Sequence, residues 1–400
     1  MISKSITDRL AESSWIRKMF EEGNRLKKIY GDDNVFDFSL GNPDLEPPAE
    51  VIDALRDITA DPAPGLHRYM NNAGYDSTRK IVADTLQKES GKTIGKDSIV
   101  MTVGAAGALN VILKTLLDCD DEVIILAPYF VEYISYIRNH GGVPVVVSSD
   151  EVTFEPDVRK ITRAITSKTK AIIINSPNNP SGAVYSRKIL KALKDVLEAA
   201  DHVIYVISDE PYKKIIFGDT EVPPVLSIFR NVIICYSWSK ALALPGDRIG
   251  FLAANPDCED YNNLMAGAVM SNRSLGFVNA PGLMQKVIER AIDAKVDVAS
   301  YERRCNLLYD IVTENGFHCT RPRGALYLFP KSPIPDDVAF AAAAAKNNLL
   351  LVPGTGFGMK GYFRLTFCVD ENVIIRSATA FRKTAEEFGL QSGVKTALKP

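Results

Sequence analysis

Short apolar runs recur between residues 98 and 253, and amphipathic helical patterns separate them. The runs lie at 98–100, 122–126, 143–147, 170–175, 202–208, 232–236 and 248–253. Nearly continuous apolar runs with helices between them are typical of parallel strands that are buried on both faces of a sheet. The pattern therefore predicts an α/β fold with a mostly parallel sheet flanked by helices.

The pattern changes beyond Gly316. Shorter apolar runs follow at 317–320, 325–329, 349–352 and 362–367, together with an alanine-rich helix and a final helix at 372–388. This mixture predicts a smaller α+β domain. Upstream of it, the stretch 257–310 is predicted to be largely helical, with a polar kink at 271–274. The first 30 residues predict an amphipathic helix with a loose apolar face, made of Ile6, Leu10, Trp15, Met19 and Phe20.

Composition excludes several classes of function. The 400 residues carry a formal net charge of −2, which argues against a nucleic-acid-binding surface. The six cysteines are scattered without CxxC pairs and the four histidines lie far apart, so we expect no metal site and a reducing compartment. No apolar run approaches the roughly 20 residues of a membrane span. Because the N-terminus also lacks the apolar core of a signal peptide, we expect a cytoplasmic protein without membrane contact.

Polar residues follow three of the predicted strands. Asn179, Asp209 and Lys240 come directly after the runs at 170–175, 202–208 and 232–236. In open parallel sheets, ligands bind beyond the carboxyl ends of the strands. Each residue alone could equally be an ordinary surface or capping group, and their shared position is what favours a site.

Lys240 suggests the chemistry of that site. A lysine that is partly desolvated loses its proton more readily, and the neutral amine forms Schiff bases with carbonyl compounds. Ser237 and Ser239 just before it and Arg248 just after it could hold an anion. An aldehyde together with a phosphate is what pyridoxal 5'-phosphate (PLP) offers.

Other residues could complete a PLP site. The turn Gly104-Ala105-Ala106 opens a helix after the run at 98–100, and free N–H groups there could face a phosphate. Asp209 could keep a pyridine nitrogen protonated, which makes the ring an electron sink. Tyr212 and Asn179 could hydrogen-bond the ring oxygen. Phe130 could stack on the ring, although a core position is about as good an explanation.

Arg364 lies within an apolar predicted strand, where an unpaired guanidinium is costly. It requires a carboxylate partner, which is either a structural Asp or Glu or the substrate itself. Arginine is suited to planar, bidentate capture of a carboxylate.

Together these motifs resemble the class I/II aminotransferases, which are PLP-dependent enzymes of fold type I. The resemblance covers nearly the whole chain through SLGNPD (39–44), HRYMNNAG (67–74), TVGAAGAL (102–109), APYFVEY (127–133), NSPNNPSG (175–182), SDEPY (208–212), SWSKALALPGDRIG (237–250) and YFRLTF (362–367). It implies a large domain at 46–290 with a seven-stranded type of sheet, a small domain at 291–400, and an N-terminal segment at 1–45 that packs with the small domain.

The resemblance also implies roles for individual residues. Lys240 would form the Schiff base and carry the proton, while Asp209 would pair with the pyridinium nitrogen. The other cofactor contacts would be Gly104, Ala105, Ala106, Phe130, Asn179, Tyr212, Ser237, Arg248 and, from the neighbouring subunit of a homodimer, Tyr69. Arg364 would bind the substrate α-carboxylate, with Gly41 and Asn179 beside it. Ala105-Ala106 departs from the hydroxyl residues of many relatives, which predicts weaker phosphate binding through backbone donors.

The leading functional prediction is an aminotransferase that moves an amino group from an L-amino acid to a 2-oxo acid by a ping-pong mechanism. A PLP-dependent C–S β-lyase and a non-catalytic ligand-binding protein are the alternatives. Some dicarboxylate-specific relatives carry a second arginine slightly upstream of a Ser-Asn pair, where this chain has Gly267 before Ser271-Asn272. Arg273 follows the pair and could be a substrate contact or a solvated charge. We therefore predict relaxed donor specificity, with 2-oxoglutarate as the acceptor.

Overall fold

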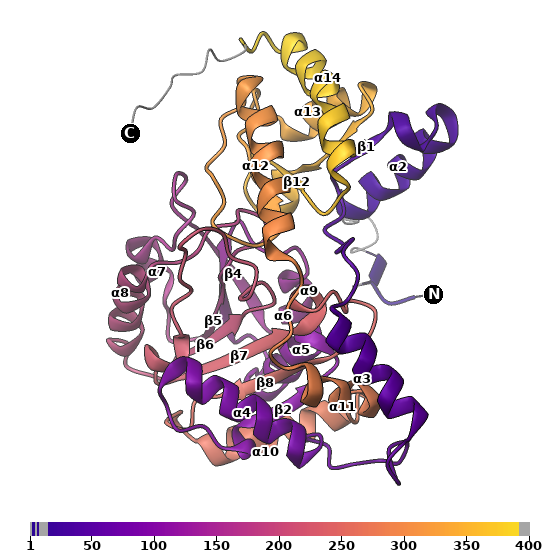
Figure 1. Cartoon of the computed structure of the whole chain (residues 1–400). Coiled ribbons are helices and arrows are strands. Elements are labelled where there is room, and N and C mark those ends of the chain that lie inside the picture. The colour runs from indigo at the N-terminus through magenta and orange to yellow at the C-terminus, as the bar shows by residue number, and fades with distance from the viewer. Residues whose placement is uncertain (1, 5, 8–14, 392–400) are drawn as a thin grey trace.

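The computed structural model describes residues 2–4, 6–7 and 15–391. A seven-stranded sheet with strand order β2-β8-β7-β6-β5-β3-β4 lies at the centre (Figure 1). Its strands are β2 Ile99–Thr102, β3 Glu122–Ala127, β4 Val143–Ser148, β5 Thr169–Asn175, β6 Tyr205–Asp209, β7 Val232–Ser237 and β8 Gly250–Ala254. The pairs β3–β4, β3–β5, β5–β6 and β6–β7 are parallel. The predicted α/β fold with a mostly parallel sheet is confirmed.

Strand β8 is the exception, because it runs antiparallel to both β7 and β2. Between β7 and β8 the chain passes through the short helix α9, Trp238–Ala241, and then through residues 242–249. A crossover between parallel strands usually contains a full helix, whereas this connection contains a helix of only four residues. The chain turns back into β8, and Lys240 stays near the end of β7.

Helices cover both faces of this sheet. They are α3 Ala49–Ala60, α4 Asp76–Ser90, α5 Gly104–Leu116, α6 Tyr133–Asn139, α7 Val158–Ala164, α8 Arg187–Glu198, α10 Tyr261–Ser274 and α11 Gly282–Ala291. Along β5, Ile172 and Ile174 join one hydrophobic cluster with α3, α4, α7, α8 and α11, whereas Ala171 and Ile173 join another with α5, α6 and α10. Since successive strand residues point to opposite faces, an unbroken apolar run fills both clusters.

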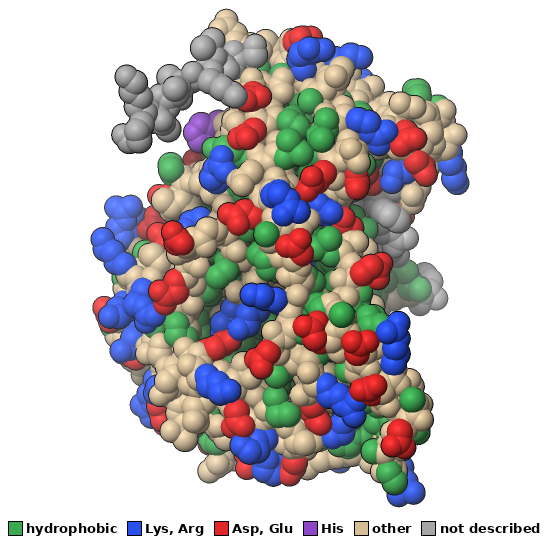
Figure 2. All heavy atoms as spheres, viewed as in Figure 1, with side chains coloured by type: hydrophobic (Ala, Val, Ile, Leu, Met, Phe, Trp, Pro, Cys, Tyr) green, Lys and Arg blue, Asp and Glu red, His purple; other side chains and the backbone are tan. Residues whose placement is uncertain are grey.

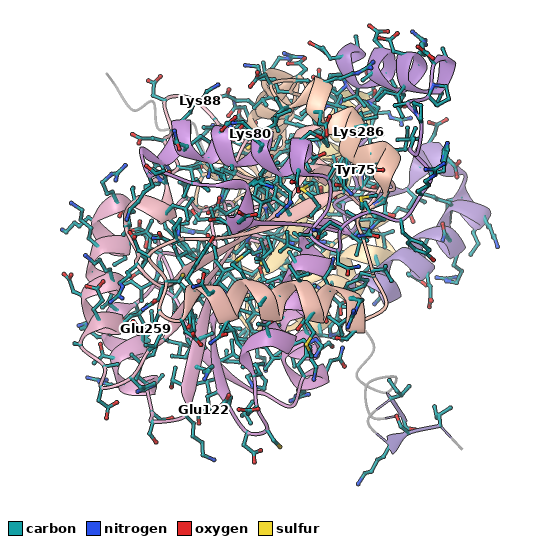
Figure 3. All side chains as sticks on the ribbon, turned by 90° about the horizontal axis from the view of Figure 1, so that it is seen from below. Tyr75, Lys80, Lys88, Glu122, Glu259 and Lys286 are labelled. Carbon is teal, nitrogen blue, oxygen red and sulfur yellow. The ribbon has the colours of Figure 1, made fainter. Side chains whose placement is uncertain are left out.

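The helices on one face are also tied to each other. Lys286 of α11 lies 4.4 Å from the ring centroid of Tyr75, the residue that precedes α4, and Figure 3 shows the two residues next to each other. Such a cation–π contact contributes about 0.5–1 kcal/mol at an exposed site.

A second core lies beyond the sheet, around α12, α13 and α14 (Figure 1). Its elements are β1 Phe36–Asp37, α12 Val298–Glu314, β9 Tyr327–Leu328, α13 Asp337–Lys346, β10 Leu349–Leu350, β11 Val352–Pro353, β12 Phe363–Thr366 and α14 Glu371–Glu387. Strand β1 pairs parallel with β10, and β12 lies between β11 and β9. Helix α2, Trp15–Tyr30, packs its Leu26 against Leu350 of β10. The N-terminal segment thus contacts the carboxyl-terminal elements.

Three local predictions are wrong or only partly testable. The stretch 317–320 is not a strand; Phe317 and Cys319 are buried and His318 is exposed, but no strand among the described residues pairs with it. Residues 271–274 are not a kink, because they form the last turn of α10, where Ser271 and Asn272 are buried. Helix α2 accounts for the predicted N-terminal helix from Trp15 onward, and Leu10 lies outside the described residues.

The surface carries charges of both signs. On the face shown in Figure 2, acidic and basic side chains are interspersed rather than gathered by sign. Across the described residues, no helix is both long enough and apolar enough to cross a membrane.

Candidate active site

The polar residues predicted at the strand ends meet at one edge of the sheet. Asn175 closes β5 and lies opposite Asp209, which closes β6. The Asn175 side chain donates to the Asp209 carbonyl over 2.8 Å, and its Oδ1 accepts from the Asn179 N–H over 2.7 Å. Asn175 was not among the predicted site residues, yet it holds the loop with Asn179 against the end of β6.

Asp209 is a buried acid with one satisfied oxygen and one free oxygen. The side chain is 5% exposed; Oδ2 accepts from the Tyr133 hydroxyl over 2.5 Å, and Oδ1 has no hydrogen-bond partner. Burial raises the pKa of Asp209 to about 7, and the Tyr133 hydrogen bond opposes this rise. A buried carboxylate oxygen without a partner is costly, and a protonated ring nitrogen is the kind of donor that would satisfy it. The free, buried acceptor oxygen of Asp209 therefore fits the protonated ring nitrogen of PLP.

Lys240 is held next to the loop that contains Gly41. Its Nζ donates to the Gly41 carbonyl over 2.8 Å. The pKa of Lys240 is lowered to about 8, chiefly by desolvation and to a smaller extent by the positive charges of Arg364 and Arg248. With this pKa, roughly a tenth of the amine is unprotonated at pH 7, and the unprotonated form is the nucleophile.

Gly41 must be a glycine for a steric reason. A Cβ at this position would lie 2.2 Å from the Tyr327 hydroxyl. That hydroxyl also lies 2.9 Å from the Tyr212 hydroxyl, with the two rings edge to face. Tyr212 and Gly41 therefore share one neighbour, Tyr327, which sequence reasoning did not identify.

The start of α5 and the start of β8 approach each other very closely. A Cβ at Gly250 would lie 2.8 Å from the Gly104 Cα, and a Cβ at Gly104 would lie 3.1 Å from the Arg248 guanidinium. The Arg248 guanidinium donates to Val103 and Pro245 carbonyls. Helix α5 is 13 residues long, and the amide N–H groups of its first turn, which contains Ala105 and Ala106, have no partners within the helix. Together with the positive charge of Arg248, they form a suitable place for a phosphate.

Two serines lie beside this group. The Ser237 Oγ accepts from the Ser239 N–H over 3.1 Å, and the two hydroxyls are 2.6 Å apart.

Phe130, which is half-buried, contacts the Tyr133 ring edge to face, with the two ring centroids 5.6 Å apart. Tyr133 thus connects the predicted stacking residue with Asp209.

Arg364 is 1% exposed and has no ion pair with any described carboxylate. It donates to the Ser39 carbonyl over 2.6 Å and to the Asn179 Oδ1 over 3.1 Å, and its Nε has no partner. The guanidinium also lies between two rings, 4.5 Å from the Tyr327 centroid and 4.8 Å from the Phe357 centroid. A structural salt bridge, the alternative weighed from the sequence, is therefore absent among the described residues.

Tyr69 does not join the other residues within the chain, because its side chain is 92% exposed. Its loop is tied to the end of α10: Asn272 donates to the Asn72 carbonyl, and Asn279 donates to the Asn71 carbonyl. The Ser-Asn pair thus anchors the loop that carries Tyr69. Arg273 next to it is exposed and pairs with no described acid.

The missed residues gave weak signals in the sequence. Tyr133 lies three positions after Phe130 in a segment that was recognised, so helical spacing from the predicted stacking residue could have indicated it. Tyr327 lies in an apolar run that was interpreted as a core strand, and nothing in that run distinguishes it from a packing residue.

Comparisons with known proteins agree with this geometry. Residues 33–381 match the family model of aminotransferase class I and II. The chain is 33% identical to an aspartate/prephenate aminotransferase of Thermus thermophilus, over 86% of this chain and 89% of the relative. It is 30% identical to aromatic-amino-acid aminotransferase 2 of Thermococcus litoralis, over 96% of each chain. A crystal structure of an amino transferase from Eubacterium rectale superposes with a TM-score of 0.94 at 37% identity, over 97% of this chain and 100% of the other.

The family model and the curated relatives agree along most of the chain, and the solved structure shares its whole architecture. The predictions of fold type, cofactor and enzyme class made from the motifs are confirmed. The chain belongs to the class I and II aminotransferases and is a PLP-dependent aminotransferase.

Proposed function

We propose that the residues gathered at the carboxyl ends of β5, β6 and β7 hold PLP and the substrate. The cofactor contacts would be Gly104, Ala105, Ala106, Phe130, Asn179, Asp209, Tyr212, Ser237, Lys240 and Arg248. PLP, when bound, draws electrons from the substrate's α-carbon and so makes its proton removable. Lys240 removes and returns that proton through Nζ, while Asp209 and Tyr133 keep a negative charge buried beside the ring nitrogen.

We propose further that Arg364 binds the α-carboxylate of every substrate. The observation that carries this proposal is a buried guanidinium with a free Nε and no described acid as partner. Ser39 and Asn179 fix the orientation of the Arg364 guanidinium, and the rings of Tyr327 and Phe357 lie against it. The edge of the guanidinium is therefore the part that can bind a planar anion. Gly41 lies in the same loop as Ser39, which brings the lysine and the arginine to one substrate.

Arg364→Lys tests this role. Lysine retains the charge but loses the bidentate geometry, so kcat/KM should fall for all amino donors alike, by a few kcal/mol of transition-state stabilisation, roughly 10²-fold or more. Arg323→Lys serves as a control on an arginine outside this set of contacts, and should leave kcat/KM unchanged. A loss confined to one donor would contradict the proposal, because the α-carboxylate is common to all of them.

For the substrate pair we propose relaxed donor specificity, covering dicarboxylic and neutral L-amino acids, with 2-oxoglutarate as the acceptor. Two features support this proposal. The position of the second arginine is occupied by Gly267, where an added Cβ would lie 2.9 Å from Thr115 of α5, and Arg273 is exposed. The named relatives act on aspartate, prephenate and aromatic amino acids.

The ratio of kcat/KM for aspartate to that for phenylalanine, before and after Arg273→Ala, measures this specificity. We expect a modest ratio that the substitution leaves unchanged. A large preference for aspartate that collapses in the variant would make Arg273 a ligand of the distal carboxylate.

We also propose that the active unit is a homodimer in which Tyr69 serves the neighbouring site. The Tyr69 side chain is 92% exposed, while Asn272 and Asn279 anchor the loop that carries it, so the side chain is held in position and available to a neighbouring subunit. Mixing inactive Lys240→Ala subunits with inactive Tyr69→Phe/Arg248→Ala subunits should restore part of the activity in hybrids. Full activity in a demonstrated monomer would rule the shared site out.

The remaining proposal concerns domains. We propose that residues 46–290 form the large domain, that 291–400 form the small one, and that 1–45 pack with the small domain. Support comes from the second hydrophobic core, which includes Phe38 together with α12, α13 and α14. Arg364 would then meet Asn179 across the domain boundary.

A further inference from the structure

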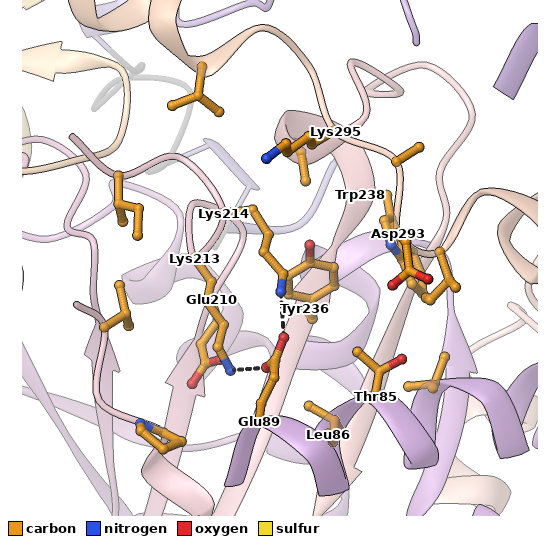
Figure 4. A pocket seen from close by; sticks show the side chains of 18 of the residues that line it. Thr85, Leu86, Glu89, Glu210, Lys213, Lys214, Tyr236, Trp238, Asp293 and Lys295 are labelled. Atoms are coloured by element: carbon orange, nitrogen blue, oxygen red, sulfur yellow. Dashed lines mark hydrogen bonds and ion pairs between the residues drawn. The ribbon is translucent and has the colours of Figure 1, made fainter. Parts of the chain in front are cut away.

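A second cavity of about 740 Å³ lies beside α9, apart from the cofactor site. Trp238 and Ala241 line it, whereas Lys240 between them does not, and neither Asp209 nor Arg364 reaches it. The walls come from α4, from residues 213–224 and from residues 292–298 (Figure 4). This volume is within the range of small-molecule sites.

One wall of the cavity is aromatic and carries unsatisfied polar groups. Tyr236 stacks on Phe251 at 5.0 Å and meets Trp238 edge to face at 5.4 Å. Tyr236 is 6% and Trp238 is 3% exposed, yet neither the phenol hydroxyl nor the indole N–H hydrogen-bonds to a described residue. Neither polar atom is fully shut off from solvent, so both remain available to donate a hydrogen bond to a ligand that enters the cavity.

The charges that line the cavity are of two kinds. Glu89 and Glu210 compensate Lys213 and Lys214: Lys213 lies 3.1 Å from Glu89 and 3.0 Å from Glu210, and Lys214 pairs with Glu89. Figure 4 shows this cluster below Tyr236.

Asp293 and Lys295 lie at the rim, where neither pairs with a described residue. The rim thus offers one free charge of each sign. A purely anionic ligand would meet the carboxylates, and a purely cationic one would meet the lysines. A zwitterion suits both.

We infer that this cavity binds a free L-amino acid with an aromatic or large apolar side chain. The side chain lies on the Tyr236–Trp238–Phe251 wall, the ammonium pairs with Asp293 and the carboxylate with Lys295. The inference concerns a site separate from catalysis and does not rest on the proposed substrate pair.

Binding here would act on α9. The Val296 N–H donates to the Ala241 carbonyl over 3.1 Å, so the 292–298 segment is bonded directly to the helix that carries Lys240. The same segment joins α11, which packs in the first core, to α12, which packs in the second. An amino acid held between the aromatic wall and this segment would favour one arrangement of α9, which makes it an effector of the enzyme.

L-phenylalanine is the probe, and Trp238 is the reporter. In Trp15→Phe holoenzyme, Trp238 is the sole tryptophan, since the chain has two. Borohydride treatment first prevents turnover. Titration should change the Trp238 emission with saturation. Asp293→Ala and Lys295→Ala should each weaken binding by about tenfold or more, as expected when one partner of a charged hydrogen bond is removed.

Controls separate this site from the catalytic one. Lys191→Ala removes an exposed lysine that does not line the cavity, and it should leave the titration unchanged. All the variants should retain the absorbance of bound cofactor, which verifies their fold. Benzoate and phenethylamine, which each lack one of the two charges, should bind at least about tenfold more weakly than L-phenylalanine. The inference is overturned if no saturable change occurs, if the change survives in Asp293→Ala/Lys295→Ala, or if benzoate binds as tightly as L-phenylalanine.

Discussion

Asp209 provides a prediction whose size follows from the structure. With the cofactor removed, burial places the pKa of Asp209 at about 7 instead of its ordinary 3.8. The unfolded chain loses this proton near the ordinary value, while the folded chain retains it until about pH 7. Between these two values the folded state binds more protons, so the free energy of unfolding falls as pH rises. The fall is about 1.4 kcal/mol per pH unit and roughly 4 kcal/mol over the whole window.

Asp209→Asn removes this titration while conserving shape. Urea unfolding of cofactor-free protein between pH 5 and 7 should therefore show the wild type losing roughly 3 kcal/mol relative to the variant. Above pH 7 the difference should level off. Asp219→Asn, at an exposed position, should follow the wild type. With PLP bound, the positively charged ring nitrogen stabilises the carboxylate and the slope should vanish.

A difference between wild type and Asp209→Asn that does not change with pH would refute the reasoning. It would mean that Asp209 ionises in the folded chain as easily as in the unfolded one, and that Tyr133 and neighbouring dipoles fully replace its lost hydration.

Further predictions concern Lys240, Gly41 and Tyr133. Borohydride reduction of the yellow holoenzyme should fix PLP on Lys240, and peptide mapping would identify the labelled residue. Lys240→Ala should retain some PLP but lose turnover. A label on another lysine would contradict the assignment. Gly41→Ala should lower kcat/KM strongly, because the added Cβ would lie 2.2 Å from the Tyr327 hydroxyl oxygen and overlap it. Adding Tyr327→Phe to this variant should restore part of the lost kcat/KM. A loss that the second substitution leaves unchanged would rule out this overlap as the cause. In cofactor-free protein, Tyr133→Phe removes a hydrogen bond to the Asp209 carboxylate that is worth about 1.5–3 kcal/mol. Because that bond holds down the pKa of Asp209, the fall in the free energy of unfolding should extend to higher pH in the variant, and an unchanged pH window would show that Tyr133 only packs.

Much of the fold could be predicted from the sequence because its signals are local. An apolar run such as 170–175 encodes a strand buried on both faces, since alternate residues must fill two cores. The positions of Asn179, Asp209 and Lys240 after such runs were enough to bring them to one edge, because parallel strands end on the same side. The direction of β8 was not encoded in this way, since an apolar run looks the same in either orientation.

The partners of the polar groups could be found only in the tertiary structure. Tyr133 and Asp209 are 76 positions apart, and Arg364 and Ser39 are 325 apart. Whether Arg364 faces an acid or a free space, and whether Tyr327 supports a site or merely packs, depends on which segments the fold brings together. Likewise, Ser271-Asn272 looked like a polar break, yet its Asn272 is buried and holds the Asn72 loop. The sequence determines strands, helices and chemical types through short-range patterns, whereas burial, pKa and partner choice arise from long-range packing that no local pattern records.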